Sequence, residues 1–284
     1  MISVRKLSYI YSPKTPFAKQ ALSEVDMEIE DGDFFGIIGS TGAGKSTLIG
    51  HINALTRVQK NSGTVIVDDV DLSVKKIDFK KLRAKVGMVF QYPEHQLFDD
   101  TVLKDVMFGP KNLGLNADEQ KDRAKKAIEL VGLNFDEFAE RSPFELSGGQ
   151  KRRVALAGVI AMQPSVLILD EPTAGLDPVG KRDIMELVLR IKEVCPTVVM
   201  ISHNMDEIAC YCNKIAVMSK GKCVGVFSPR ELFGCKELIE KSGVGLPLVT
   251  QAAAMLNAAG VDIDPAILTE NELVDALVKA AGNA

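Results

Sequence analysis

A phosphate-binding motif of the form G-x4-G-K-S/T is made by Gly39, Ser40, Thr41, Gly42, Ala43, Gly44, Lys45 and Ser46. The motif follows the apolar run Asp33–Ile38 and opens a helical pattern from about Lys45 to Leu55, which is the context it requires. Backbone N–H groups of residues 42–46 can form an anion cradle, with Lys45 reaching the β and γ phosphates and the Ser46 hydroxyl binding Mg²⁺. A glycine-rich turn without a ligand is the alternative, but the flanking strand and helix favour a nucleoside triphosphate site.

Two carboxylates, Asp170 and Glu171, come directly after the apolar run Val166–Leu169. Asp170 is placed to bind Mg²⁺, as in P-loop NTPases. Glu171 is placed to polarise a water that attacks the γ phosphate. An Asp-Glu pair after a strand is weak evidence alone, since a loop carboxylate is the commoner reason for it. Together with the phosphate motif, the pair predicts hydrolysis of a nucleoside triphosphate such as ATP.

A second glycine-rich segment, Leu146–Gln150, precedes the helical pattern Lys151–Met162 and contains Ser147, Gly148 and Gly149. Two glycines let a phosphate approach backbone amides at a helix N-terminus. Because one nucleotide rarely needs two phosphate cradles, this one is predicted to serve the nucleotide of a partner chain. The alternative is an ordinary serine N-cap followed by a flexible glycine pair.

Short strand-like runs alternate with helical stretches along the chain, which predicts an α/β fold. The region Thr101–Glu140 is helical in pattern without a strand signal. From about residue 228 the pattern becomes wholly helical, with capping boxes at Ser228–Glu231 and Thr269–Glu272 and a helix at Pro247–Ala259. The other predicted strands are Val4–Tyr9, Val25–Ile29, Thr64–Val67, Val86–Phe90, Thr197–Ile201 and Lys214–Met218.

The composition suits a folded chain of one large domain or two: 284 residues, 46% hydrophobic and 25% charged. A formal net charge of −4 does not indicate a nucleic-acid partner. The longest apolar stretch, Val154–Met162, is too short to span a bilayer, and Met1–Ile10 lacks a signal-peptide pattern. Five scattered cysteines, of which Cys210 and Cys212 are the only close pair, predict free thiols in a reducing compartment rather than disulfides or a zinc site.

Five motifs in this order resemble those of ABC-transporter ATP-binding cassettes, over about Met1 to Phe227. The resemblance implies a P-loop NTPase core with an antiparallel β-subdomain and an α-helical subdomain at about 92–162. It further implies an ATP-binding domain at 1–227 and a small C-terminal α-helical domain at 228–284. The motifs are the phosphate motif, Leu146–Gln150, Val166–Glu171, Ala174–Asp177 and His203, and Gln91 matches the glutamine loop.

A finer resemblance, to the ATPases of energy-coupling factor (ECF) transporters, rests on Val89–Phe98, Leu146–Met162 and Asp170–Pro178. Tyr9–Phe17 favours the second ATPase of the ECF pair. This implies a translocase that powers the uptake of vitamins or transition-metal ions. It also implies a second ECF-type ATPase (heterodimer, with a homodimer as the alternative), a transmembrane T subunit and substrate-binding S subunits. The chain would then lie at the cytoplasmic face of the cell membrane, with no nucleic acid bound.

The resemblance also implies roles for individual residues. Tyr11 would stack on adenine, although an aromatic residue in a turn is the alternative. Glu171 would be the catalytic base, Gln91 would touch Mg²⁺ and the attacking water, and His203 would contact the γ phosphate. Lys45 and Thr47 would hold the nucleotide, and Ser147, Gly148 and Gly149 would bind the partner's ATP, with Asp177 at the dimer interface.

Two further regions are implied to be interfaces. The segment Tyr92–Phe98 and the helices up to Glu140 would form a groove for the coupling helices of the T subunit. In it Glu94 would meet a basic residue or else be solvated. The C-terminal leucines would contact the second ATPase or pack in a small core of their own; they are Leu232, Leu238, Leu248, Leu256 and Leu277.

Three other functions compete with this interpretation. An ATPase of a conventional importer with a soluble binding protein is disfavoured by Val89–Phe98 and by the absence of a long β-rich C-terminal pattern. A soluble, non-transport ABC protein acting on ribosomes or DNA usually needs two cassettes or a coiled-coil insertion. A P-loop kinase has no use for the segment Leu146–Gln150.

Overall fold

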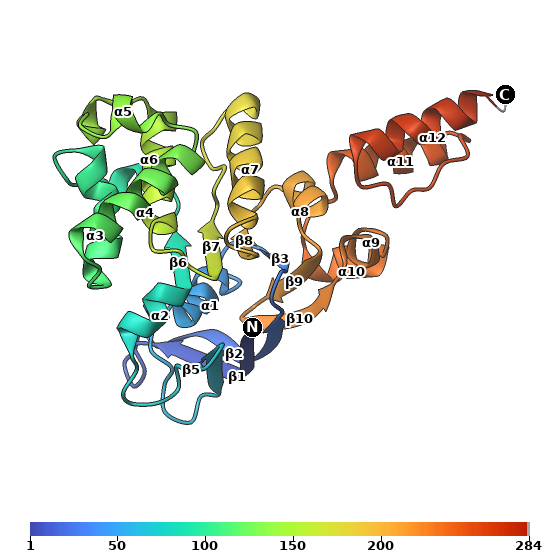
Figure 1. The fold of residues 1–284 in the computed structure, drawn as a ribbon. Helices are drawn as coiled ribbons and strands as arrows, with labels where there is room; N and C mark the ends of the chain where they lie inside the picture. Colours follow the sequence, from blue (N-terminus) through green and yellow to red (C-terminus); the bar gives the residue numbers. More distant parts are fainter. Residues whose placement is uncertain (283–284) are drawn as a thin grey trace. The chain divides into compact units, whose positions relative to one another are not determined.

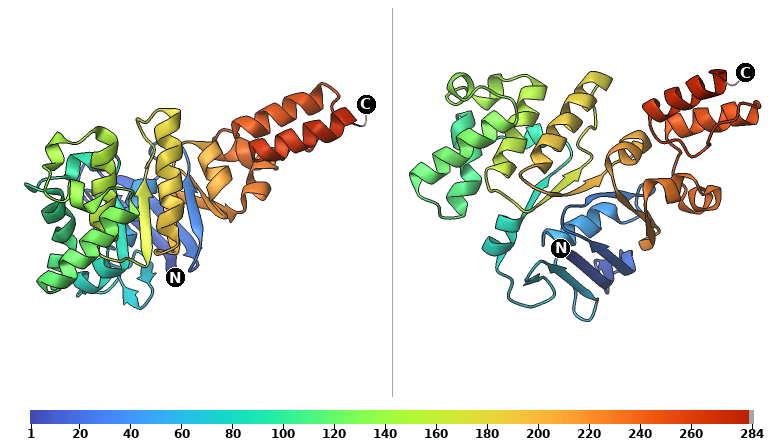
Figure 2. Two further views of the ribbon diagram at one scale, coloured as in Figure 1. Left: turned by 45° about the horizontal axis from the view of Figure 1, so that its top comes forward. Right: turned by 45° about the vertical axis from the view of Figure 1, so that its right-hand side comes forward.

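The computed structural model describes residues 1–282 of the chain. It has two compact units, one formed by Met1–Ser73 together with the chain from Ile201 onward, the other by Val74–Met200. Figures 1 and 2 show strands and helices in both. In the part of the chain described, no helix is long and apolar enough to cross a membrane. The predicted domains, 1–227 and 228–284, and the helical subdomain at about 92–162 stay predictions.

The first unit contains an antiparallel sheet with strand order β2-β1-β4-β5. Alternate side chains of β1, such as those of Ile2 and Val4, are fully buried, because successive residues of a strand point to opposite faces. This sheet is the antiparallel β-subdomain that the resemblance implied. Its strands are β1 (Ile2–Tyr11), β2 (Lys19–Ile29), β4 (Thr64–Val67) and β5 (Val70–Asp71), so β1 and β2 are longer than predicted and β5 was not predicted.

A second group of strands in the first unit positions the phosphate motif. Strand β3 (Phe34–Ile38) is buried along its whole length and pairs in parallel with β9 (Lys214–Ser219), which pairs with β10 (Lys222–Phe227). Helix α1 (Lys45–Ile52) follows β3 after the phosphate motif. It ends three residues before the predicted Leu55, because Asn53 ends the helical hydrogen bonding and Ala54 takes a positive φ of 52°.

The second unit contains three neighbouring strands in the order β8-β7-β6. They are β6 (Val86–Val89), β7 (Val166–Asp170) and β8 (Thr197–Ile201), which confirms the predicted strands there. β6 and β7 run parallel, with Val86 opposite Val166 and Val89 opposite Leu169. Helix α7 (Pro178–Lys192) begins at Asp177, whose side chain accepts a hydrogen bond from the Gly180 N–H.

The rest of the second unit is helical, as predicted for Thr101–Glu140. The helices α3, α4 and α6 pack on one another, and Figure 1 shows them with α5 as a green group. Helix α2, in which four basic residues surround a single buried residue, Leu82, was not predicted. The helical elements are α2 (Phe79–Lys85), η1 (Pro93–Gln96), α3 (Val102–Asn112), α4 (Ala117–Leu130), α5 (Phe135–Phe138), η2 (Pro143–Glu145) and α6 (Gly148–Ile160).

The C-terminal part of the first unit, from residue 229 on, consists of helices joined by loops, and Figures 1 and 2 show its last two helices side by side. Ser228 and Glu231 form the predicted capping box, and Ala253, Ile263 and Ile267 form a small core. Of the predicted contact leucines, Leu232 is buried, Leu256 packs against this core, and Leu248 and Leu277 are exposed. These helices are α9 (Pro229–Phe233), α10 (Lys236–Ser242), α11 (Leu248–Ala258) and α12 (Glu270–Gly282), and α8 (Met205–Tyr211) precedes them, before β9.

Candidate nucleotide site

The phosphate motif passes so close to neighbouring backbone that two of its residues must be glycine. Gly39 has a φ of 146°, and a Cβ there would lie 2.1 Å from the Met218 carbonyl oxygen. Gly44 has a φ of 102°, and a Cβ there would lie 2.6 Å from the Ala21 carbonyl oxygen. Both the backbone conformation and the available space exclude a larger residue. The glycine spacing in the sequence therefore encodes the shape of this loop.

The N-terminus of α1 is built to receive an anion. Gly44 is its N-cap residue, and no side chain caps the helix there. The N–H groups of the first turn of a helix lack partners within the helix and carry a partial positive charge. An uncapped N-terminus behind a glycine-rich loop thus fits the triphosphate of a nucleotide.

Lys45 places a buried positive charge at this loop. Its side chain is only 7% exposed, and Nζ donates hydrogen bonds to the carbonyl oxygens of Gly39 at 2.7 Å and Ser40 at 3.2 Å. The ammonium group therefore lies along the loop that would hold the phosphates. Ser46, the next residue, is exposed in the first turn of α1 and can offer its hydroxyl to a cation.

Tyr11 is tied to the helix that follows the phosphate motif. It is the last residue of β1, is 43% exposed, and its hydroxyl lies 3.1 Å from Oγ1 of Thr47 in α1. The predicted adenine platform and the predicted phosphate cradle are therefore joined directly. The structure brings these candidates together within one unit.

The candidates for hydrolysis gather at one edge of the parallel strands in the second unit. Val89 of β6 lies opposite Leu169 of β7 in the parallel pair. Gln91 is two residues after Val89 and Glu171 is two residues after Leu169, so both lie at the same edge of these strands. Asp170 is the last residue of β7. Glu171 has a φ of 52°, in the left-handed region that a non-glycine residue seldom occupies. Strain of this kind is typical of functional positions.

His203 is exposed and follows β8 by two residues. The backbone on both sides of it is fixed by the buried carboxylate of Glu207, which accepts hydrogen bonds from Ser202 Oγ at 3.0 Å and Asn204 Nδ2 at 3.1 Å. Asn204 also caps α8. Sequence analysis did not identify these three supporting residues, although an Asn N-cap with a Glu three residues later is a local signal that could have done so.

Ser147 caps α6, and its side chain forms a capping box with Gln150. The two glycines that follow, Gly148 and Gly149, are exposed at the start of the helix. A Cβ added to either one would meet no atom within 4 Å, and neither has a positive φ. Residues 1–282 of their own chain therefore give no packing reason for glycine at these positions.

Arg152 links three of the predicted motifs. It lies one turn into α6, is 3% exposed, and contacts Glu94 and the carbonyl oxygen of Ala174. The basic residue that Glu94 meets is thus in its own chain. A Cβ on Gly175 would lie 3.3 Å from the Tyr92 ring, so the segments around residues 92 and 175 also touch directly.

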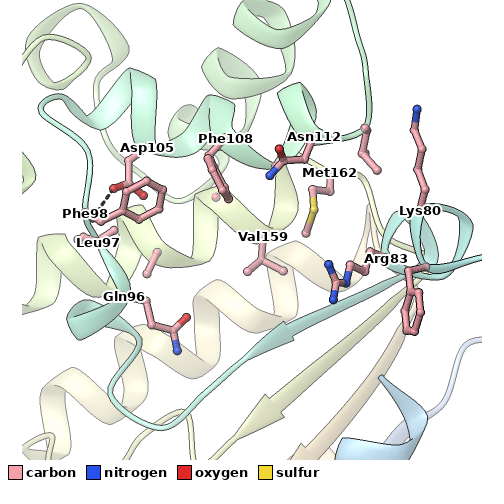
Figure 3. Close-up of a pocket in the computed structure, with 15 residues that line it drawn as sticks. Lys80, Arg83, Gln96, Leu97, Phe98, Asp105, Phe108, Asn112, Val159 and Met162 are labelled. Atoms are coloured by element: carbon pink, nitrogen blue, oxygen red, sulfur yellow. Dashed lines mark hydrogen bonds between the residues drawn. The ribbon is translucent and has the colours of Figure 1, made fainter. Parts of the chain in front are cut away.

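An apolar groove of about 500 Å³ lies between α2, α3 and α6 in the second unit (Figure 3). The rings of Phe98 and Phe108 meet edge to face at 4.9 Å, and both remain about half exposed. Asp105 holds the segment before α3 by accepting hydrogen bonds from the N–H groups of Phe98 and Asp99. Lys80 and Arg83 add positive charge on the α2 side.

The oxygen donors among the candidates suit Mg²⁺. Ser46 offers a hydroxyl, Gln91 an amide oxygen and Asp170 a carboxylate, all hard ligands. Within residues 1–282 no group of three or more His, Cys, Asp or Glu side chains could hold a metal ion. Mg²⁺ is usually bound by one or two side chains together with substrate phosphates rather than by a dedicated cage. The donor set therefore fits a cation that arrives with a nucleotide.

Comparison with known proteins shows where this chain belongs. The family model described as ABC transporter matches residues 22–174. The energy-coupling factor transporter ATP-binding protein EcfA2 of Clostridium tetani is 45% identical over 283 residues, which are 99% of this chain and 98% of the relative. The protein of that name from Symbiobacterium thermophilum is 51% identical over 271 residues, covering 95% of this chain and 93% of the relative.

Two solved structures have the same fold. CbiO1 from Clostridium perfringens, described as part of the ABC transporter complex CbiONQ, has a TM-score of 0.72 and 39% identity, covering 84% of this chain and 93% of that chain. A dimeric ATP-binding cassette in a post-hydrolysis state with ADP and Pi has a TM-score of 0.69 and 28% identity, covering 80% of this chain and 98% of that chain. The cassette fold predicted from the sequence is confirmed.

Proposed function

Since this chain belongs to the ABC transporter family, and within it to the ATP-binding subunits of energy-coupling factor transporters, we propose that its motifs bind Mg²⁺–ATP and hydrolyse it to power uptake through membrane subunits. The observation that carries this proposal is the phosphate loop. Its two obligatory glycines, the uncapped N-terminus of α1 and the buried ammonium of Lys45 together suit a triphosphate.

In this mechanism the chain positions the reactants and stabilises charge. The loop amides and Lys45 hold the phosphates, and Tyr11 stacks on adenine. Glu171 accepts a proton from the water that attacks the γ phosphorus, and the bond to ADP breaks as Pi forms. Gln91 and His203 orient that water and the γ phosphate. Ser46, Asp170 and Gln91 would hold Mg²⁺, which would supply positive charge to neutralise the phosphate oxygens.

A second ATPase chain completes each site in this proposal. Gly148 and Gly149 have open space around them, and their backbone conformation does not require glycine. The close approach that glycine permits therefore serves another molecule. Ser147, Gly148 and Gly149 contact the ATP held by the partner, with Asp177 at the same interface. The partner is a related ECF-type ATPase, and a homodimer is the alternative.

The groove beside Phe98 and Phe108 is the docking site for a helix of the transmembrane T subunit, which in turn joins substrate-binding S subunits. Two half-exposed aromatic rings over an apolar floor suit the apolar face of a helix. The chain therefore sits at the cytoplasmic face of the membrane. The substrates taken up are vitamins or transition-metal ions, chosen by the S subunits.

The last two helices provide a further contact with the second ATPase. Their core residues pack inward, while Met255, Val274 and Val278 are each more than half exposed. Apolar side chains gathered on one helix pair favour a protein contact.

Purification of the chain from its native membrane in a mild detergent, followed by mass spectrometry, tests the assembly. A second related ATPase, a T subunit and one or more small S subunits are expected. Two long permease subunits with an extracytoplasmic binding protein would assign the chain to the conventional importers. Copurifying nucleic acid without membrane proteins would favour a soluble, non-transport ABC protein.

A further inference from the structure

His51 is a fully buried imidazole in the last turn of α1, the helix that begins at the phosphate motif. Its Nδ1 lies 2.7 Å from the carbonyl oxygen of Thr47, one turn earlier. Because a carbonyl oxygen can only accept, Nδ1 carries the proton. The other ring nitrogen, Nε2, is buried and has no hydrogen-bond partner within the described residues.

An orphaned buried nitrogen costs free energy that an apolar residue of similar size would avoid. Burial also lowers the pKa of His51, which favours the neutral ring, and the bond to the Thr47 carbonyl fixes its tautomer. The position therefore has a cost that packing alone does not explain. The contacts of the ring indicate what the imidazole provides.

Four contacts connect His51 to Tyr11, the predicted adenine platform, and back again, and we call this closed set the His51 circuit. Its ring meets that of Tyr9 edge to face, with centroids 4.7 Å apart and planes at 74°. Tyr9 meets Tyr11 in the same way, at 4.8 Å and 88°. The Tyr11 hydroxyl lies 3.1 Å from Oγ1 of Thr47, and the backbone carbonyl of the same residue accepts the His51 hydrogen bond.

Edge-to-face contacts are directional, so two of them in series restrict the plane of the last ring. The hydroxyl bond to Thr47 restricts its remaining freedom. Tyr11 is therefore held in orientation although it is 43% exposed. An aromatic platform that is immobilised before binding loses less conformational entropy when a base stacks on it.

We propose that His51 is a positioning residue for the nucleotide base, which acts through Tyr9 and Thr47 to hold Tyr11 in its stacking orientation. The proposal rests on the proposed function, in which Tyr11 stacks on adenine. Because both ends of the circuit rest on α1, the base platform is fixed relative to the phosphate cradle at the other end of that helix. His51 itself touches neither the base nor the phosphates.

Two substitutions each break one link of the circuit. His51→Phe keeps a ring against Tyr9 but removes the N–H that Thr47 accepts. His51→Asn keeps a donor near the position of Nδ1 but removes the ring. Tyr11→Ala removes the platform and serves as the reference variant. The full-length chain is titrated with two probes, Mg²⁺–ATP and inorganic tripolyphosphate, each competing with a fluorescent ATP analogue.

Both His51 variants are expected to bind ATP about 2- to 10-fold more weakly, the change that corresponds to one hydrogen bond in His51→Phe and to one aromatic pair in His51→Asn, with tripolyphosphate affinity unchanged. Equal weakening toward both probes would overturn the proposal, because His51 would then support the phosphate loop. Unchanged ATP affinity would overturn it as well. Tyr11→Ala distinguishes the two ways of failing. If the His51 variants and Tyr11→Ala all leave ATP affinity unchanged, the role of Tyr11 in the proposed function fails. If the His51 variants fail the test but Tyr11→Ala lowers the affinity for ATP and not for tripolyphosphate, only the role of His51 fails.

Discussion

The guanidinium of Arg152 contacts the carboxylate of Glu94 through two nitrogens, Nε at 3.1 Å and Nη2 at 3.3 Å. The same group donates to the carbonyl oxygen of Ala174 at 3.2 and 3.3 Å. One buried side chain of α6 therefore joins the segment that borders the groove to the segment that leads toward Asp177.

Replacing Arg152 is expected to cost more stability than replacing Glu94. Arg152→Met leaves the Glu94 carboxylate and the Ala174 carbonyl without their partner, and a broken buried pair typically costs roughly 3–5 kcal/mol. Glu94→Gln removes the charge but keeps an oxygen that can accept, and should cost about 1–2 kcal/mol. Urea unfolding of the single and double variants measures the coupling. Additive effects in the double variant would show that the two side chains do not interact energetically.

Gly149→Ala separates folding from function. Since a Cβ at residue 149 meets nothing within 4 Å, the variant should be as stable as the parent, or up to about 1 kcal/mol more stable. Hydrolysis should fall sharply if, as proposed, the partner's nucleotide approaches residue 149, because the added methyl group would occupy that space. Thermal unfolding and Pi release are measured together.

Gly44→Ala is the matched comparison for Gly149→Ala. A Cβ at residue 44 would clash with the Ala21 carbonyl, so this variant should lose stability as well as hydrolysis. Undiminished hydrolysis in Gly149→Ala would count against the shared site.

Glu171→Gln is expected to lower the rate of hydrolysis by about 100- to 10,000-fold, the usual contribution of a general base. The amide has nearly the same shape, so the left-handed backbone at residue 171 and the affinity for ATP should persist. Pi release and nucleotide titration give the two quantities separately. Loss of ATP affinity along with the rate would show that Glu171 supports the fold of the site rather than the chemistry.

Phe108→Asp tests the groove. It places a charge on an apolar surface that is already 47% exposed, so stability should change by less than about 1 kcal/mol. Copurification of the membrane subunits should be lost. Leu189→Asp, on the 43% exposed Leu189 of α7 outside the groove, is the control and should retain them. Retention of the membrane subunits by both variants would move the docking surface elsewhere.

The parts of the structure that local patterns determine were predictable. The glycine positions of the phosphate loop follow from backbone geometry at Gly39 and Gly44, and the buried strands follow from unbroken apolar runs. β10 was not predicted, since its side chains alternate between half-buried and exposed positions and Gly225 interrupts the apolar pattern.

Contacts between distant residues were not predictable in the same way. Arg152 and Glu94 are 58 residues apart, and nothing in either local sequence selects the other. The sequence therefore predicted either a basic partner for Glu94, which it did not identify, or a solvated carboxylate. The His51 circuit joins β1 to α1 across some 40 residues of chain, and a single histidine on a helix gives no sign of it. Such tertiary relationships require the fold.

Stability should depend on pH through His51. Burial lowers its pKa from the ordinary 6.5, so below that pH the unfolded chain binds a proton more readily than the folded chain. Above about pH 6.5 the titration of His51 does not lower stability; as pH falls from there toward the lowered pKa, stability is lost. His51→Phe cannot titrate, so the free energy of unfolding of the parent should decrease relative to this variant between about pH 7.5 and 5.5. Urea unfolding across that range measures the difference, and a constant difference would mean that the imidazole can take up its proton without leaving its buried position.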